Sequence, residues 1–154
     1  MQLDTTRFGT VEIDENAVIT FTHPIIGFQE FRRFVLIPTS EGSPIVWLQS
    51  TESPELAFLL MDPRQAVADY QPRLRAEELA ELAVTDVEEL SVYTLLVVPA
   101  DRSQIRTNLK APILINPKHR LGKQSIMEHG DYPVRYYLAE ERRPMELSNA
   151  RTHS

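Results

Sequence analysis

Proline spacing is the feature that most limits what this 154-residue chain can fold into. Eleven prolines are spread along the sequence, and the longest interval without one lies between Pro72 and Pro99. Proline breaks the interior of a helix, and an isolated helix needs about 12 residues to be stable, so most intervals are too short for one. We therefore expect mainly short elements, most of them strands.

The segments between the prolines support this prediction. They contain short apolar runs rich in β-branched and aromatic residues, a composition typical of strands. Several runs are apolar throughout, which indicates strands that are covered on both faces. The sequence therefore predicts a mostly β fold, a compact antiparallel β-barrel-like single domain over residues 1–138 with one or two short helices. The runs are 18–21, 34–37, 45–48, 58–61 and 92–98.

Two short helices are expected. The first lies in residues 76–83, where small and apolar residues recur at i, i+3, i+4 and i+7 and form one stripe. The second is a single turn after Asp62, which can cap it with Pro63 as the first helical residue. In the first helix the stripe is Ala76, Leu79, Ala80 and Ala83, and the residues expected to face solvent are Glu77, Glu78 and Glu81.

Composition limits the class of protein. The chain has no cysteine, which excludes disulfides, thiolate metal sites and cysteine nucleophiles. Its first residues lack the apolar segment of a signal peptide, and no run approaches the length of a membrane span. We expect a soluble, cytoplasmic protein without membrane contact. Residues 139–154 are polar and charged, and we expect this tail to be disordered.

Charge is distributed unevenly along the chain. The net charge is −6, but residues 1–101 carry 17 acidic and 6 basic side chains, whereas residues 102–154 carry 5 acidic and 10 basic. The protein would therefore present two oppositely charged faces, provided that the fold does not interleave these halves. A net negative protein attracts basic partners and repels free nucleic acid at long range.

The sequence shows no catalytic or metal-binding pattern. No two of its four histidines have a zinc-site spacing, and none is paired with a nucleophile. His119 lies in a predicted hairpin turn, and a small hydrolase using His119 or His129 is the weaker alternative. The sequence Gly122-Lys123-Gln124-Ser125 lacks the upstream glycine of a phosphate loop. We predict no catalytic residue, no metal, no cofactor and no small-molecule substrate.

An acidic stretch spans residues 76–90 and contains no basic residue. It is either a solvated helix face with the loop that follows, or a docking surface for a basic partner. Charged rims of this kind raise association rates and select partners, whereas buried apolar groups anchor them. The acidic side chains are Glu77, Glu78, Glu81, Asp86, Glu88 and Glu89.

A basic stretch runs from Arg102 to Lys123 without an acidic residue. A nucleic-acid site pairs such charges with exposed aromatic side chains for base stacking, and this segment has no Phe, Tyr or Trp. We expect an ordinary basic hairpin that does not bind nucleic acid directly. The alternative function is a small RNA-binding β-barrel module that uses this stretch.

Several segments between residues 3 and 138 occur in an order that resembles the flagellar assembly factor FliW family. Their sequences are FGTVEI (8–13), ITF and PIIGF (19–28), WLQS and PELAF (47–58), NLKAPI (108–113), and GKQ with YPVR (122–135). The resemblance implies a non-enzymatic cytoplasmic protein that binds flagellin and, alternatively, the translational repressor CsrA. It would antagonise CsrA and so couple flagellin translation to the level of free flagellin.

Contact residues follow from this resemblance together with charge and expected exposure. CsrA-type repressors bind RNA and need a basic surface, so an acidic partner is physically sensible. Trp47, the only tryptophan, is expected to be a core anchor. For the repressor surface we predict Glu77, Glu78, Glu81, Glu88 and Glu89, and for the flagellin surface Phe28, Asn108, Leu109 and Lys110.

Overall fold

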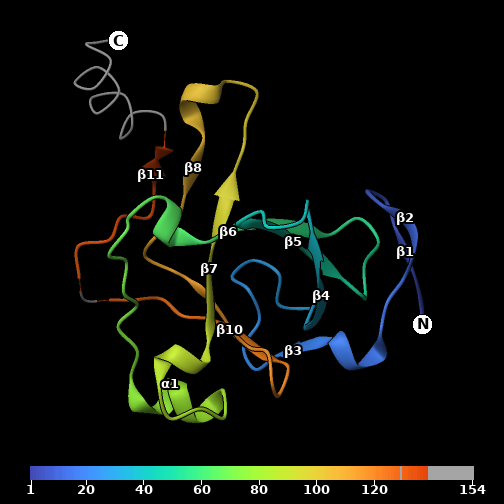
Figure 1. Cartoon of the computed structure of the whole chain (residues 1–154), viewed down its shortest axis with the longest axis horizontal. Coiled ribbons are helices and arrows are strands. Elements are labelled where there is room, and N and C mark those ends of the chain that lie inside the picture. Colours follow the sequence, from blue (N-terminus) through green and yellow to red (C-terminus); the bar gives the residue numbers. More distant parts are fainter. Residues whose placement is uncertain (129, 139–154) are drawn as a thin grey trace.

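Seven strands of the computed structural model, which describes residues 1–128 and 130–138, close into a small barrel (Figure 1). Strand β10 pairs with both β9 and β3, and β7 pairs with both β6 and β9, which closes the ring. All of these pairings are antiparallel except that of β10 with β3. The predicted barrel-like β fold is confirmed. The barrel strands are β3 (Ile19–Phe21), β4 (Arg33–Pro38), β5 (Ile45–Ser50), β6 (Ala57–Met61), β7 (Ser91–Val97), β9 (Ile113–Asn116) and β10 (Leu121–Gln124).

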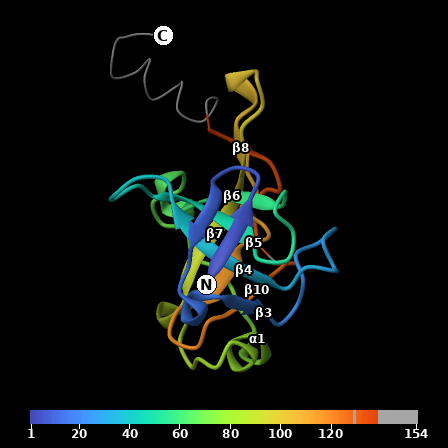
Figure 2. The ribbon, with the colours of Figure 1, turned by 90° about the vertical axis from the view of Figure 1, so that its right-hand side faces the viewer.

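Shorter elements surround the barrel. Strands β1 (Gln2–Thr5) and β2 (Gly9–Glu12) form a separate hairpin, and β8 (Arg106–Thr107) and β11 (Tyr136–Tyr137) extend the sheet beyond β7. Figures 1 and 2 show the β7–β8 hairpin and the helix α1 (Ala76–Glu81) at opposite ends of the molecule. The remaining elements are the 3-10 helices η1 (Glu15–Ala17), η2 (Pro63–Gln65), η3 (Val87–Glu89) and η4 (Arg102–Gln104).

The apolar runs of the sequence become strands, and β9 is covered on both faces. All four residues of β9 are buried. Ile113 and Ile115 belong to the core inside the barrel, whereas Leu114 packs on the outside in a second cluster beneath α1. Burying a side chain of this size contributes about 1.5–3 kcal/mol. The barrel core consists of Ile19, Phe21, Ile25, Phe34, Leu48, Leu60, Ile113 and Ile115.

The face that α1 turns to the barrel differs from the prediction. The buried residues are Glu78 and, just after the helix, Leu82, whereas three of the four expected stripe residues are exposed and Leu79 is half-buried. The helix ends at Glu81, and Ala83 adopts a left-handed φ of 60°. A helix of six residues is too short for a periodic stripe to determine its orientation, so its packing depends on what its residues meet in the fold.

Trp47 does not lie in the barrel core as expected. Residues alternate across a strand, and in β5 its neighbours Val46 and Leu48 pack against the core, so Trp47 points outward. There its ring meets the edge of Phe8 at 6.0 Å, and the Arg7 guanidinium lies 4.2 Å from the ring centroid. Trp47 therefore attaches the β1–β2 hairpin to the outside of the barrel.

The two halves of the chain are interleaved, so the condition for two oppositely charged faces is not met. Strands β9 and β10, from the second half, lie between β7 and β3 of the first half. The basic stretch is also divided. Arg102 is part of η4, in the loop between β7 and β8, whereas Arg120 lies in the β9–β10 turn. Figures 1 and 2 show the β7–β8 hairpin at one end of the molecule and the β9–β10 turn toward the other. The stretch therefore does not form one continuous basic surface.

Two local predictions are confirmed. The Asp62 carboxylate accepts a hydrogen bond from the Arg64 N–H at 2.9 Å and caps η2, in which Pro63 is the first residue. His119 is exposed in the β9–β10 turn. The tail predicted to be disordered, residues 139–154, lies outside the described residues. Among the described helices, none is long and apolar enough to span a membrane.

Candidate protein-docking site

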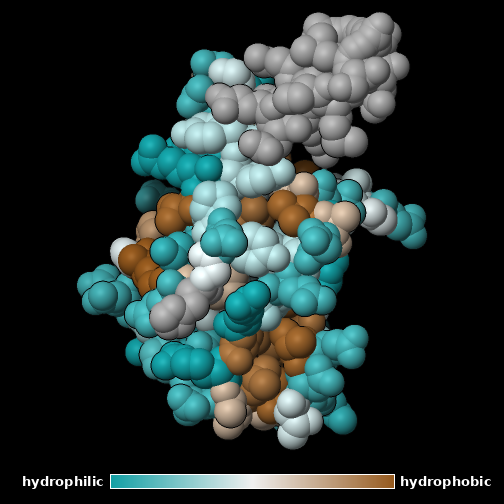
Figure 3. Space-filling view, turned by 90° about the vertical axis from the view of Figure 1, so that its left-hand side faces the viewer, coloured by the Kyte–Doolittle hydropathy of each residue, from teal (hydrophilic) through white to brown (hydrophobic). Residues whose placement is uncertain are grey.

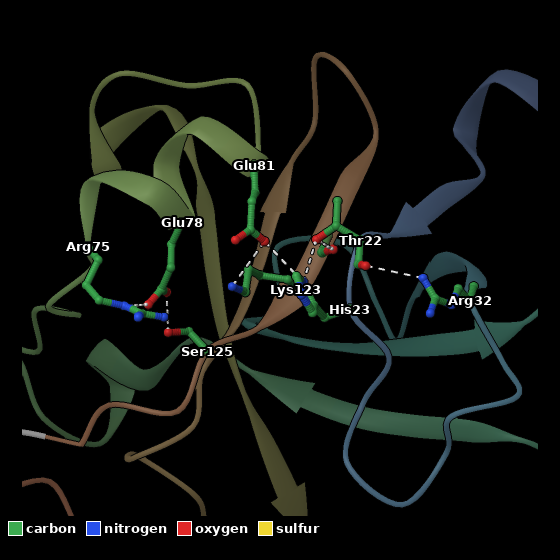
Figure 4. A network of polar contacts seen from close by, with 9 residues as sticks. Thr22, His23, Arg32, Arg75, Glu78, Glu81, Lys123 and Ser125 are labelled. Atoms are coloured by element: carbon green, nitrogen blue, oxygen red, sulfur yellow. Dashed lines mark hydrogen bonds and ion pairs between the residues drawn. The ribbon is translucent and has the colours of Figure 1, made fainter.

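A groove of about 660 Å³ runs along the inner side of α1. Its walls come from three parts of the sequence: residues 23–26 after β3, residues 73–81 with α1, and residues 123–128 in and beyond β10. Figure 4 shows glutamates of α1 pointing toward the β10 segment across the groove. The barrel positions all three walls, because β10 lies next to β3 and the second core cluster supports α1.

Glu78 is buried at the base of α1, where it was predicted to face solvent. Its residue is 4% exposed. One carboxylate oxygen accepts a hydrogen bond from the Ser125 hydroxyl, and the other lies 3.0 Å from Arg75 Nε. This pairing raises the pKa of Arg75 above its ordinary value. A buried carboxylate requires such partners, so Glu78 holds α1 against the β10 segment and is not part of the exposed acidic surface.

Glu81 joins all three walls of the groove. Its Oε2 atom lies 3.3 Å from Lys123 Nζ on β10 and 3.1 Å from His23 Nδ1 after β3 (Figure 4). The Lys123 side chain is only 8% exposed, so it contributes little to the charge of the surface. The structure thus removes the last residue of the basic stretch from any outer basic face and places it inside the groove.

His23 also approaches a hydroxyl group, but in a geometry that does not suit catalysis. Thr22 Oγ1 lies 3.4 Å from Nδ1, the same ring nitrogen that faces Glu81. A catalytic histidine accepts the proton of the nucleophile on one ring nitrogen while the carboxylate binds the other. Within the described part of the chain, no group of three or more His, Cys, Asp or Glu residues could hold a metal ion. We therefore consider the groove as a candidate binding site.

Exposed apolar side chains lie in and beside the groove. Ile26 is 60% exposed and Ile126 is 52% exposed, and both line it. The Ile26 N–H donates to Gln124 Oε1 at 3.0 Å, which fixes this loop against β10. Figure 3 shows hydrophobic residues gathered toward the α1 end of one face, with hydrophilic residues around them. Exposed apolar groups with a polar rim are typical of protein interaction sites.

Phe28 is exposed, as the predicted flagellin surface requires. It is 36% accessible, and its ring meets the edge of Phe58 with the centroids 4.9 Å apart. The preceding Gly27 has a φ of 89°, a left-handed conformation that glycine adopts without strain. This turn carries both Phe28 and Ile26. The proximity of Ile26 to Ile126 depends on contacts between distant segments, and sequence reasoning missed both isoleucines.

The predicted acidic surface is retained in part. Glu77 and Glu88 are exposed, and their carboxylates have no hydrogen-bond or ion-pair partner among the described residues. Glu89 is exposed but caps η3, because its side chain accepts hydrogen bonds from the N–H groups of Thr85 and Asp86, both at 3.0 Å. These bonds lower the pKa of Glu89. Of the glutamates predicted for the repressor surface, Glu77 and Glu88 therefore have carboxylates that are free to contact a partner.

The expected exposure of the 108–110 segment is wrong for Leu109, which is fully buried. Leu109 packs with Tyr70 and Met127, and the Tyr70 hydroxyl donates to the Leu109 carbonyl at 2.7 Å. Asn108 accepts hydrogen bonds from the N–H groups of Lys110 at 3.0 Å and Ala111 at 3.1 Å. Asn108 and Lys110 are half-buried, so this segment is mainly a structural turn.

The fold and the groove define a class of protein: a small closed β-barrel with a candidate interaction surface at its α1 end. The family model described as FliW protein matches residues 2–138. Flagellar assembly factor FliW of Geobacter sulfurreducens is 38% identical over 136 residues, which cover 88% of this chain and 85% of that protein. The corresponding protein of Ruminiclostridium cellulolyticum is 36% identical over 148 residues, 96% of this chain and 100% of the relative.

The same relationship is found in three dimensions. A crystal structure of the flagellar assembly factor FliW matches with a TM-score of 0.81 and 33% sequence identity, over 90% of this chain and 96% of that one. This chain belongs to the FliW family of flagellar assembly factors. The family resemblance predicted from the sequence is confirmed.

Proposed function

We propose that this protein binds flagellin and, alternatively, a CsrA-like translational repressor in the cytoplasm. Binding of the repressor releases flagellin translation, and free flagellin restores repression by occupying the protein. The switch operates by mass action and needs only that the two binding events exclude each other. Membership of the FliW family supports this proposal, as does a surface that offers protein contacts.

The observation that carries the proposal is the combination of free carboxylates with exposed apolar groups at the α1 end. Glu77 and Glu88 are exposed and unpaired in the described chain, and Ile26 and Ile126 are exposed in the groove. Carboxylates accelerate the approach of a basic protein, and apolar side chains anchor it. A repressor that binds RNA presents the matching basic surface.

The repressor surface comprises the outer glutamates of α1 and η3: Glu77, Glu81, Glu88 and Glu89. Glu77 and Glu88 contribute charge directly, whereas Glu81 and Glu89 already have partners within the protein. Glu78 acts from beneath by holding α1 in place. For flagellin we propose the surface around Phe28, with Asn108 and Lys110 as further contacts and Leu109 supporting their turn from within.

Isothermal titration with the flagellin and CsrA of the same organism tests this function. Each partner is titrated separately, and the second is then titrated into the complex of the first. We expect binding in both single titrations and loss of heat in the competition, because occupation by one partner blocks the other. Simultaneous binding of both partners would remove the switch, and binding of flagellin alone would leave a flagellin chaperone without a translational role.

A further inference from the structure

Lys123 is a buried cation with unused hydrogen-bonding capacity. An ammonium group carries three N–H donors. Among the described residues, Lys123 Nζ has one acceptor, Glu81 Oε2 at 3.3 Å, although its side chain is only 8% exposed. The residue lines the groove along α1. Two of these donors therefore have no protein acceptor among the described residues, and a ligand that supplies one gains a charge-assisted hydrogen bond.

Other charges in the lining determine where an anionic group fits. Arg73 is exposed in the same groove, and its guanidinium has no partner in the described part of the chain. Glu128 also lines the groove with an unpaired carboxylate. Glu78 is neutralised by Arg75. Repulsion by Glu128 disfavours an anion beside it. At Lys123 a second carboxylate shares the ammonium with Glu81 and uses the N–H donors that Glu81 leaves free.

The groove also offers apolar contacts close to this position. Ile26 and Ile126 are more than half exposed, and both line the same hollow as Lys123. Ile126 follows Lys123 by three positions, and Ile26 is tied to the intervening Gln124 by the hydrogen bond at 3.0 Å. A ligand that fills this groove therefore presents an apolar group next to a carboxylate.

We propose that the groove binds a segment of a partner protein in which an apolar side chain stands next to an Asp or Glu side chain. The apolar side chain packs on Ile26 and Ile126, and the carboxylate accepts a hydrogen bond from Lys123 Nζ. This ligand segment is acidic, whereas the outer glutamates of α1 suit a partner with a basic surface. The groove and the outer surface of α1 therefore recognise different chemical groups, which can belong to one partner or to two, and the inference stands whether or not the repressor binds.

Peptide selection on the intact protein tests the proposal. Random short peptides are displayed with their C-termini fused to a carrier, so that every carboxylate is that of a side chain. They are selected on wild type, Lys123→Met, Ile126→Ser and the control Lys118→Met, whose lysine is exposed in the β9–β10 turn. We expect wild type and Lys118→Met to enrich peptides with an apolar residue beside Asp or Glu. Recovery should fall about tenfold or more on Lys123→Met and on Ile126→Ser, as loss of about 1.4 kcal/mol or more of binding energy implies.

A titration cycle makes the test independent of any loosening of α1 in Lys123→Met. An enriched peptide and its analogue with Asp→Asn or Glu→Gln are titrated into wild type and Lys123→Met. We expect wild type to bind the amide analogue more weakly than the acidic peptide. Lys123→Met should bind both peptides equally, because it lacks the ammonium group that donates to the carboxylate. Selection of basic or purely apolar peptides, no enrichment, or an equal loss in both proteins would overturn the proposal. Tighter binding of a free peptide C-terminus than of the side-chain carboxylate would overturn the assignment to a side chain.

Discussion

Ser125 donates a hydrogen bond to Glu78 across the base of the groove, with the two oxygen atoms 2.5 Å apart. Both residues are buried, and one lies on α1 while the other lies just beyond β10. The contact divides the acidic stretch into two parts. Glu78 faces inward and fixes the helix, whereas Glu77 and Glu88 face outward and are free to attract a partner.

Glu78→Ala is expected to lower the free energy of unfolding by about 1–3 kcal/mol, because it leaves the buried Ser125 hydroxyl without its acceptor. The lost pair with Arg75 adds little, since that side chain is 72% exposed and its charge is screened by solvent. Urea unfolding followed by circular dichroism measures the change. Glu77→Ala is the matched control and should stay within about 0.5 kcal/mol of wild type. Equal effects of the two substitutions would contradict the division of roles.

Gly122→Ala is expected to destabilise the closure of the barrel. A Cβ atom at this position would lie 2.8 Å from Phe21 Cε1 and 3.2 Å from Ile19 Cγ2, where β10 pairs with β3. Overpacking of this kind costs about 1–3 kcal/mol. Thermal unfolding of the single variant, of Phe21→Leu and of the double variant checks the cause. The smaller leucine side chain at position 21 makes room for the added methyl group, so Gly122→Ala should cost less stability in the Phe21→Leu background than in wild type. Strictly additive effects would rule out the contact.

Reversing the free carboxylates is expected to slow association with the repressor without changing the fold. Glu77→Lys with Glu88→Lys removes the attraction for a basic surface, and rim charges act mainly on the association rate. Surface plasmon resonance should show a reduced association rate, and added salt should shrink the difference from wild type because it screens the charges. Flagellin binding, measured in parallel, should be unaffected. A repressor association rate equal to that of wild type would remove these glutamates from the interface.

Glu52 is expected to make stability depend on pH under acidic conditions. Its side chain accepts hydrogen bonds from the N–H groups of Arg32 at 2.7 Å and Arg33 at 3.0 Å, which lower its pKa from the ordinary value of 4.5. Because the folded pKa is the lower one, the stabilisation is present above pH 4.5 and is lost as the pH falls through the folded value. Glu52→Gln should therefore flatten the decline of urea stability below pH 4.5. A decline as steep as that of wild type would assign it to other carboxylates.

The sequence was sufficient for the fold class because prolines and apolar runs are local signals. Strand β9 is apolar at three successive positions, and the structure covers it on both sides. The parallel pairing of β10 with β3 was not predicted, since Gly122 and Phe21 meet only after the chain has passed through five other barrel strands. That pairing also interleaves the two charged halves.

The site was less accessible to sequence reasoning because its contacts join distant positions. Glu78 and Ser125 are 47 residues apart, so nothing near Glu78 reveals that it is buried. The exposure of Leu109 was misjudged for the same reason, since Tyr70, which covers it, lies 39 residues away. Phe28 was recognised as a candidate for exposure because its signal is local: it directly follows the glycine of its own turn.

Cell-free translation of flagellin messenger RNA tests the proposed switch most directly. The reaction contains the CsrA-like repressor at a concentration that suppresses flagellin synthesis, and this protein is then added, followed by purified flagellin. The account predicts that this protein restores synthesis and that flagellin suppresses it again in proportion to its concentration. Synthesis that stays repressed after this protein is added, or that stays high after flagellin is added, would contradict the account.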